Sequence, residues 1–285
     1  AVTTDTIRAM IARIVARSSE NRLGPGHSEP AFGAPLVGCS SGADPLYRQY
    51  VEHIGSFYLT PLRIFETAFP EDAPIVPQEL TVISWILPST AVTRKEQSEA
   101  VRRPSERWAR TRLFGERFNE TLRREVVAAL SDAGVPAVAP MLTEFWERRA
   151  EGPYAPCSNW SERHAAYAAG LGTFGLCDGL ITPLGKAVRI GSVVARIALP
   201  PSKRPYADHH DYCLHYAHGT CGKCIQRCPV NALSREGHHK QRCMEYTEHG
   251  MREFMRERYG LDTYACGLCQ AAVPCMDHIP TPEEG

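Results

Sequence analysis

Two cysteine-rich runs decide the fold of this chain: CLHYAHGTCGKCIQRCP at residues 213–229 and CGLCQAAVPC at residues 266–275. Cys243 stands alone between them, so eight of the eleven cysteines lie beyond residue 212 of the 285-residue chain. A [4Fe–4S] cluster takes four thiolate ligands. A short Cys-x2-Cys turn supplies two of them, and a cysteine followed by proline commonly serves a neighbouring cluster. Eight cysteines in this pattern therefore predict two iron–sulfur clusters.

Zinc and disulfides are the competing interpretations of these cysteines. A zinc ribbon needs only four ligands and no Cys-Pro step. A disulfide framework is typical of small, loop-rich chains in oxidising compartments, and this sequence starts without a basic-plus-apolar signal segment. We therefore favour iron–sulfur clusters over both. The scattered Cys39, Cys157 and Cys177 are expected to be ordinary small buried residues.

The order of the cysteines predicts which of them share a cluster. In the interlaced pattern, the early cysteines of the first run join the last cysteine of the second run. The first predicted quartet is Cys213, Cys221, Cys224 and Cys275, and the second is Cys228, Cys243, Cys266 and Cys269. His218 stands three residues before Cys221, where a standard run has a cysteine. We favour Cys213 over His218 as the fourth ligand because thiolate is the usual ligand, and His218 remains the alternative.

Composition narrows the functional class. The 32 basic and 32 acidic residues give a formal net charge of zero, so the chain lacks the charge excess typical of bulk nucleic-acid binding. No apolar run approaches the roughly 20 residues that span a bilayer. We expect a cytoplasmic protein without a membrane partner.

Hydrophobic periodicity predicts alternating helices and strands before the cysteine runs. We expect helices over 1–20, 46–56, 61–68, 105–132 and 159–169, and strands over 82–87, 136–138 and 188–199. This order indicates an α+β fold with layered α/β packing. The proline-rich stretch 200–205 reads as a linker, which predicts a core domain over 1–205 and a cluster domain over 206–285.

Several polar or glycine-rich stretches have two interpretations each. Residues 170–175 formally match Gly-x-Gly-x-x-Gly, but a helix is expected before them where a dinucleotide site needs a strand. The turn could bring backbone close to a flat cofactor, or it could be a tight connection without a ligand. Lys186 and Arg189 could hold a polar cofactor tail or form a solvated rim. The histidine pairs 209–210 and 238–239 are expected to be surface loop residues.

The chain resembles the epoxyqueuosine reductase-like proteins, which are relatives of the reductive dehalogenases. The resemblance rests on Ala-Ala-Gly-Leu-Gly at 168–172, a following strand with Gly-Ser at 191–192, and Cys-Gly-Lys-Cys at 221–224. Cys-Pro at 228–229, Cys243 and Cys-Gly-Leu-Cys-Gln at 266–270 complete it. The sequence looks most like a short branch of double-cluster proteins without C-terminal helical repeats.

The resemblance implies a nitroreductase-like, cobalamin-binding core followed by a ferredoxin-like module with two [4Fe–4S] clusters. It further implies a reductase in which electrons pass from the clusters to cobalt. The residues that would then line the corrin are Gly170, Leu171, Gly172, Thr173, Phe174, Gly175, Lys186, Arg189, Gly191 and Ser192.

The chain also departs from the family pattern. Epoxyqueuosine reductases carry a proton-donating aspartate just before the segment that matches 155–170, whereas residues 154–158 here contain no carboxylate. Glu162, Tyr154 and Cys157 are the substitute candidates. We therefore expect a small-molecule substrate, an external donor of the ferredoxin or flavodoxin type, and no role for tRNA.

Two other functions fit the sequence. The chain could be an electron-transfer iron–sulfur protein without cobalamin that serves a partner enzyme. It could also bind another flat cofactor, such as a flavin, on the same core. Bound base-off cobalamin would favour the reductase, and a released yellow chromophore would favour the flavin protein.

Overall fold

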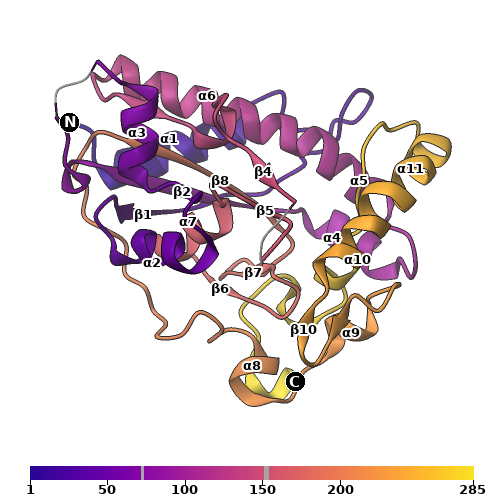
Figure 1. Ribbon diagram of the computed structural model, residues 1–285. Helices are drawn as coiled ribbons and strands as arrows, with labels where there is room; N and C mark the ends of the chain where they lie inside the picture. The colour runs from indigo at the N-terminus through magenta and orange to yellow at the C-terminus, as the bar shows by residue number, and fades with distance from the viewer. Residues whose placement is uncertain (72–73, 151–153) are drawn as a thin grey trace.

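A four-stranded antiparallel sheet forms the centre of the protein (Figure 1). The computed structural model describes residues 1–71, 74–150 and 154–285. In the order β1-β2-β8-β3, the strands span Leu36–Ser41, Thr81–Pro88, Val188–Ala195 and Ala137–Val138. Every residue of β2 is buried because this strand lies between two others and has helices on both faces. The helices and the sheet confirm the predicted mixed architecture.

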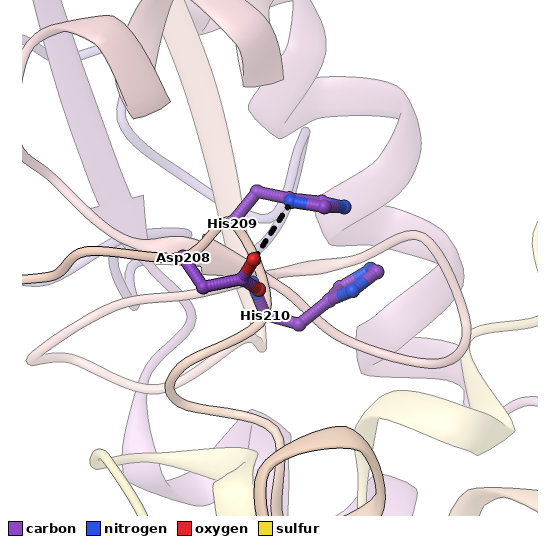
Figure 2. Close-up of side chains that lie close together, drawn as sticks. All are labelled: Asp208, His209 and His210. Carbon is purple, nitrogen blue, oxygen red and sulfur yellow. Dashed lines mark hydrogen bonds and ion pairs between the residues drawn. The ribbon is translucent and has the colours of Figure 1, made fainter.

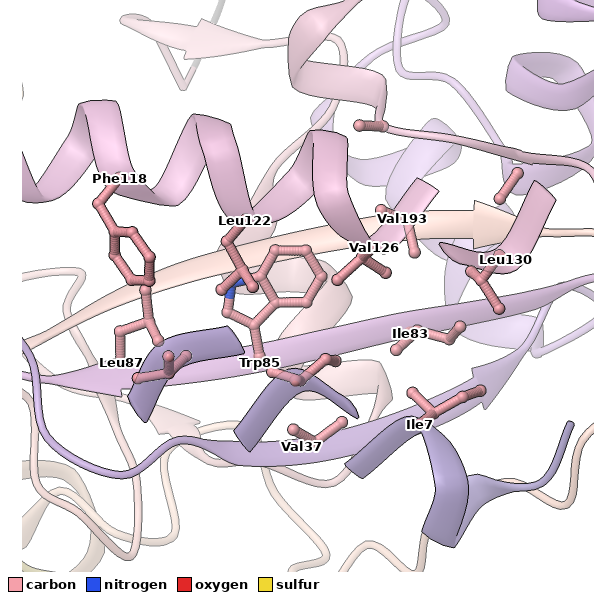
Figure 3. Close-up of a cluster of buried hydrophobic side chains, with 14 of the residues drawn as sticks. Ile7, Val37, Ile83, Trp85, Leu87, Phe118, Leu122, Val126, Leu130 and Val193 are labelled. Carbon is pink, nitrogen blue, oxygen red and sulfur yellow. The ribbon is translucent and has the colours of Figure 1, made fainter. Parts of the chain in front are cut away.

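Helices α1 (Thr4–Arg17) and α6 (Glu116–Asp132) cover one face of the sheet. Figure 3 shows side chains of α6 pointing onto Trp85 and its neighbours in β2. Phe118, Leu122, Val126 and Leu130 recur every four residues, and all are buried at this interface. The periodic stripe seen in the sequence is therefore the core-facing side of α6.

The opposite face carries α2 (Pro45–Ile54), α3 (Pro61–Ala68) and α7 (Glu162–Ala168). Tyr47 of α2 stacks on Trp160, which lies two residues before α7, with ring centroids 5.9 Å apart. Ser161 caps α7 by accepting a hydrogen bond from the backbone of His164. Since the cap is fixed by an aromatic cluster, the start of α7 is held firmly against the sheet.

The helix predicted over 105–132 is interrupted. Helix α5 (Glu106–Arg110) passes through a π-helical turn at Thr111–Gly115 before α6 begins. A π-helical turn changes the angular phase of the residues on either side of it. Phe114, four residues before Phe118, therefore leaves the core-facing side of α6 and packs against the cluster of α5 and α11 side chains.

The C-terminal part consists of short helices and one small hairpin, and it lies against α5 at one side of the core (Figure 1). Its elements are α8 (Leu214–His218), α9 (Lys223–Gln226), β9 (Leu233–Ser234), β10 (Gly237–His238), α10 (Lys240–Met244), a π-helical turn at Glu245–Gly250 and α11 (Met251–Tyr259). Met251 and Met255 of α11 pack against Ala109 of α5. Gln97 in α4 (Ala91–Glu99) donates to the backbone carbonyl of Cys266 at 2.7 Å.

Two short strand pairs complete the core. β4 (Arg148–Arg149) pairs with β5 (Cys157–Ser158), and β6 (Thr173–Phe174) pairs with β7 (Leu180–Ile181). Strand β1 was not predicted, because its sequence LVGCSS lies inside a stretch rich in glycine, proline and serine. The stretch 200–205 has no regular secondary structure, and the division into domains at that point stays a prediction.

Candidate functional site

The four cysteines of the first predicted quartet line one small pocket. Cys213 is the N-cap of α8, Cys224 lies in α9 just after Cys221, and Cys275 comes from the 3-10 turn Pro274–Met276. Cysteines more than 50 residues apart in sequence are thus brought together by the packing of one turn onto two short helices. His218 is exposed at the end of α8, and the described lining of this pocket does not include it.

The cysteines of the second quartet meet at a different and much larger cavity of about 700 Å³. Cys228 follows α9, Cys243 lies in α10, and Cys266 and Cys269 flank the start of the 3-10 turn Leu268–Gln270. All four line the same cavity. The two quartets inferred from spacing therefore line two different cavities, and their division into two cluster-binding sets stays a prediction.

Gly267 fixes the Cys266–Cys269 turn against the core. Its φ of +62° lies in the left-handed region, and a Cβ there would lie 2.2 Å from Nε1 of Trp108 in α5. Only glycine fits such a close approach in this conformation. The indole of Trp108 also lines the large cavity, so this contact joins the second quartet to the α5 side of the core.

Two of the predicted ligands, Cys224 and Cys266, strongly prefer their protonated form when no metal is bound. Burial raises the pKa of Cys224 to about 12 and the pKa of Cys266 to about 12. Metal binding needs thiolates, so it must release protons at these positions. All eleven cysteines are free, which leaves every predicted ligand available.

Cys177 belongs with these groups, although the sequence suggested only an ordinary buried residue. It lines the large cavity, and Lys186 Nζ donates to its sulfur at 3.5 Å. A hydrogen bond from Cys269 and the charge of Lys186 lower the pKa of the Cys177 thiol. No sequence signal identifies Cys177, because its neighbours come from distant parts of the chain.

His238 also lies in the cavity lining, so its assignment to a surface loop is wrong. Its Nδ1 lies 2.8 Å from Oδ2 of Asp178, and only 14% of its side chain is exposed. Burial opposes a charge on this imidazole. Hydrogen bonds to Asp178 and Cys243 outweigh that effect and raise the pKa of His238 to about 10.

A buried ionic network forms another wall of the cavity. Arg123 of α6 lies 3.2 Å from Glu116 and 3.1 Å from Glu162, and all three line the cavity. Ser192 donates a hydrogen bond to Glu162 and receives one from the indole of Trp160 at 3.1 Å. One cation is thus shared by two carboxylates, and each carboxylate keeps a defined orientation.

Glu162 is a candidate proton donor whose carboxyl group lies at the cavity, where burial favours the protonated form. Burial raises its pKa, and Arg123 and Ser192 oppose that rise only in part. Cys157 in β5 also lines the cavity. Tyr154 does not appear in the described lining; it is 39% exposed and its hydroxyl lies 2.9 Å from Nε2 of His53.

Only two of the predicted corrin-lining residues, Lys186 and Arg189, line the cavity. Gly170 and Gly172 are instead packing positions, where a Cβ would lie 2.3 Å and 2.2 Å from backbone carbonyl oxygens. Gly191 is also a packing position, because a Cβ there would lie 2.4 Å from the indole ring of Trp85. Among the described residues, the positions outside the lining are Gly170, Leu171, Gly172, Thr173, Phe174, Gly175, Gly191 and Ser192. Their part in cofactor binding stays a prediction.

The exposed loop before α8 brings Asp208, His209 and His210 together (Figure 2). Ligand atoms of the three residues lie within 4.8 Å of one another, and His209 Nδ1 is 3.5 Å from Asp208 Oδ2. The three positions are consecutive, and Asp208 and His209 are exposed. We assign no metal to this group.

Comparisons with known proteins support the resemblance found in the sequence. No family model matches the chain. An epoxyqueuosine reductase of Bacillus cereus is 31% identical over 119 residues, which are 40% of this chain and 29% of that relative. The matched segment thus spans under a third of the curated relative, so the activity of that whole protein can enter here only as a proposal.

The fold was also compared with solved structures. A reductive dehalogenase described in terms of B12-dependent dehalogenation has a TM-score of 0.52 and 15% identity, covering 86% of this chain and 30% of its own. This likeness shows a shared fold. An epoxyqueuosine reductase solved with an epoxyqueuosine-modified tRNA-Tyr stem loop has a TM-score of 0.43 and 17% identity, covering 87% of this chain and 65% of its own. The resemblance to epoxyqueuosine reductases and reductive dehalogenases is confirmed, and the relatives are oxidoreductases, as predicted.

One prediction about partners is wrong. The absence of a carboxylate in residues 154–158 led to the expectation that tRNA is unlikely as a partner. The curated relatives are epoxyqueuosine reductases, and one such enzyme was solved with a tRNA stem loop. A neutral total charge and one missing side chain do not exclude such a partner.

Among the described helices, none combines the length and the apolar composition that a membrane-spanning helix requires.

Proposed function

Starting from its similarity to the epoxyqueuosine reductases, we propose that this chain is an iron–sulfur reductase with two [4Fe–4S] clusters and a cobalamin. The first quartet would hold one cluster and the second quartet the other. The observation that carries the proposal is that the first quartet lines one small pocket and the second quartet lines the large cavity.

The residues present fit the two clusters. The small pocket offers four thiols, and the large cavity offers the four of the second quartet together with Cys157 and Cys177. Each quartet comes from three separate segments, which suits the four-thiolate ligation of a cubic cluster. The thiols are sheltered by Leu176, Leu233 and Val273, and such burial protects a cluster from solvent. Bound clusters would supply one-electron transfer.

The cavity fits a large cofactor that must lie next to a cluster. Its volume of about 700 Å³ falls in the usual range for cofactor sites. Its walls combine the aromatic rings of Trp108 and Trp146 with the polar side chains of Arg112 and Arg189. A cobalamin bound there would supply the reducing chemistry, and the protein would supply orientation and proton delivery.

We assign proton delivery to Glu162. Its carboxyl group lines the cavity and lies in a position where burial favours the protonated form. General acids work best when their pKa is close to the operating pH, and burial of a carboxyl group moves its pKa in that direction. Cys157 is the second candidate at the cavity, and Tyr154 is the third.

The substrate and the electron source follow from the same proposal. The reductant would be an external ferredoxin- or flavodoxin-type donor that reaches the cluster domain, which we place at 206–285, while 1–205 would form the cofactor and substrate core. The substrate is either a small molecule or a modified nucleoside in tRNA. The curated relatives are epoxyqueuosine reductases, so a tRNA that contains epoxyqueuosine can be tested directly.

The test is an anaerobic reconstitution followed by titration with cobalamin. About eight irons per chain and a shift of the visible spectrum to the base-off form are the expected results. The reduced protein is then incubated with an epoxyqueuosine-containing tRNA stem loop, with heat-denatured protein as the control. Eight irons without cobalamin binding would overturn the reductase and leave an electron-transfer protein that serves a partner enzyme.

A further inference from the structure

Lys186 is a buried lysine without a carboxylate partner in the described parts of the chain. The residue lies in the connection between β7 and β8 and is only 3% exposed. Its Nζ donates a hydrogen bond to Cys177 Sγ at 3.5 Å. A buried ammonium group is costly unless an anion compensates it, so the partner must be sought among the sulfur atoms.

The backbone fixes Lys186 against the first quartet. Its N–H donates to the carbonyl of Cys275 at 2.9 Å, and the next N–H, of Ala187, donates to Met276 at 3.1 Å. Gly185 adopts a φ of +73°, and a Cβ there would lie 2.2 Å from the carbonyl oxygen of Met276. These close contacts leave the base of the Lys186 side chain little freedom.

The side chain itself lies between the two quartets, since Lys186 is the lysine that lines both pockets in the described structure. Lys186 shares the lining of the large cavity with Cys177 and Cys269, and the lining of the smaller pocket with Cys224 and Cys275. Thiolates bound to iron at these positions would surround the side chain with negative charge, which compensates a buried ammonium group.

An iron–sulfur cluster with four thiolates is an anion, and it gains a further negative charge on reduction. A fixed cation nearby stabilises the reduced state more than the oxidised state, and net charge around a cluster sets its potential. The effect is large in a buried site, because little solvent screens the charge.

We propose that Lys186 is a shared counter-cation that raises the reduction potentials of both clusters, and that Cys177 holds its ammonium group between them. This inference rests on the proposed two-cluster function. It gives Lys186 a role in tuning the clusters, in place of the predicted contact with a cofactor tail. Cys177, the ninth thiol of the site, is then a positioning residue and not a ligand.

The test compares three reconstituted variants of the full chain with the wild type. Lys186→Met removes the charge and keeps a similar length, and Lys186→Arg keeps the charge. Lys223→Met is the matched control, because Lys223 lies between Cys221 and Cys224 and is exposed. Iron and sulfide are counted on each sample, and both midpoint potentials are measured by a redox titration followed by electron paramagnetic resonance.

Lys186→Met should shift both midpoints to more negative values, whereas Lys186→Arg and Lys223→Met should stay near the wild type. A fully loaded Lys186→Met protein with no larger shift than Lys223→Met would overturn the inference. If Lys186→Met fails to load iron, loading of Lys186→Arg supports a need for charge, and failure of both shows that only shape matters at this position. A wild type that lacks two clusters would instead refute the proposed function.

Discussion

Arg123 and Glu162 form an ion pair of 3.1 Å at the wall of the large cavity, and the side chain of Arg123 is only 2% exposed. The same guanidinium lies 3.2 Å from Glu116 and donates to the carbonyl of Ile190 in β8 at 3.2 Å. Helix α6, strand β8 and the start of α7 are therefore joined through one side chain, and the orientation of the candidate proton donor depends on it.

Replacing Arg123 by methionine should destabilise the protein by about 3–5 kcal/mol, because it leaves the buried Glu162 without its cation and leaves Glu116 with Arg189 at 3.6 Å. Urea unfolding measures the loss. Arg124→Met is the matched control: its side chain is 61% exposed and pairs with Glu120 at 3.5 Å, so about 0–1 kcal/mol is expected. Equal losses of unfolding free energy in both variants would show that the buried ion pairs contribute no more to stability than the exposed one.

The fourth ligand of the first cluster can be settled by a pair of variants. Cys213→Ala should lower the iron content by up to about four atoms per chain and alter the resonance spectrum of one cluster. His218→Ala should leave both unchanged, because His218 is exposed and outside the pocket lining of the described chain. Full iron and an unchanged spectrum in Cys213→Ala would falsify the Cys213 assignment and favour His218.

Gly267 and Gly260 provide a test of the contact between the cluster turn and Trp108. Both have a left-handed φ, +62° and +65°, but a Cβ at Gly260 meets nothing within 4 Å. Alanine at Gly260 should cost only the backbone strain of about 1–2 kcal/mol. Alanine at Gly267 adds overpacking of about 1–3 kcal/mol against Trp108. Thermal unfolding of the loaded proteins compares them, and identical midpoints would mean that Trp108 moves aside freely.

His164 should make stability depend on pH. Burial among Tyr50, Tyr58 and Phe174 lowers its pKa from 6.5 to about 3, so the folded protein holds it neutral. Below pH 6.5 the unfolded chain binds a proton that the folded chain does not, and stability falls as pH falls toward 3. The slope from this group is at most about 1.4 kcal/mol per pH unit.

The His164→Gln variant should show a shallower decline than the wild type between pH 7.5 and 5.5, since it lacks this proton uptake. Denaturant unfolding at several pH values gives the two slopes. Parallel slopes would contradict the neutral, buried state of His164.

The cysteines that line each cavity could be grouped from the sequence because ligand spacing is a local property, and their binding of clusters stays a prediction. Cys221, Cys224 and Cys228 lie on one short helix and its ends, and the interlaced pattern then places Cys275 with the first group. The strong strands and the stripe of α6 were likewise visible, because burial repeats at the period of the element.

Other features depend on tertiary contacts that no local pattern records. Cys177 and Lys186 meet thiols from distant segments, and Gly170 and Gly172 proved to be sites of close backbone packing. Strand β1 was missed because its glycine and serines acquire burial only from the sheet and the covering helices. In each case the contacts that define the role of the residue exist only in the folded chain.

The π-helical turn at Thr111–Gly115 has a consequence for how the chain tolerates insertions and deletions. Each residue of an α-helix advances the direction of the side chains by roughly 100°. Removing one residue here would therefore swing Trp108 away from Gly267 while Phe118 kept its place on the sheet. The alignment of the cysteine-bearing part with the core thus depends on the number of residues in this turn, and the deletion of a single residue here would misalign the two.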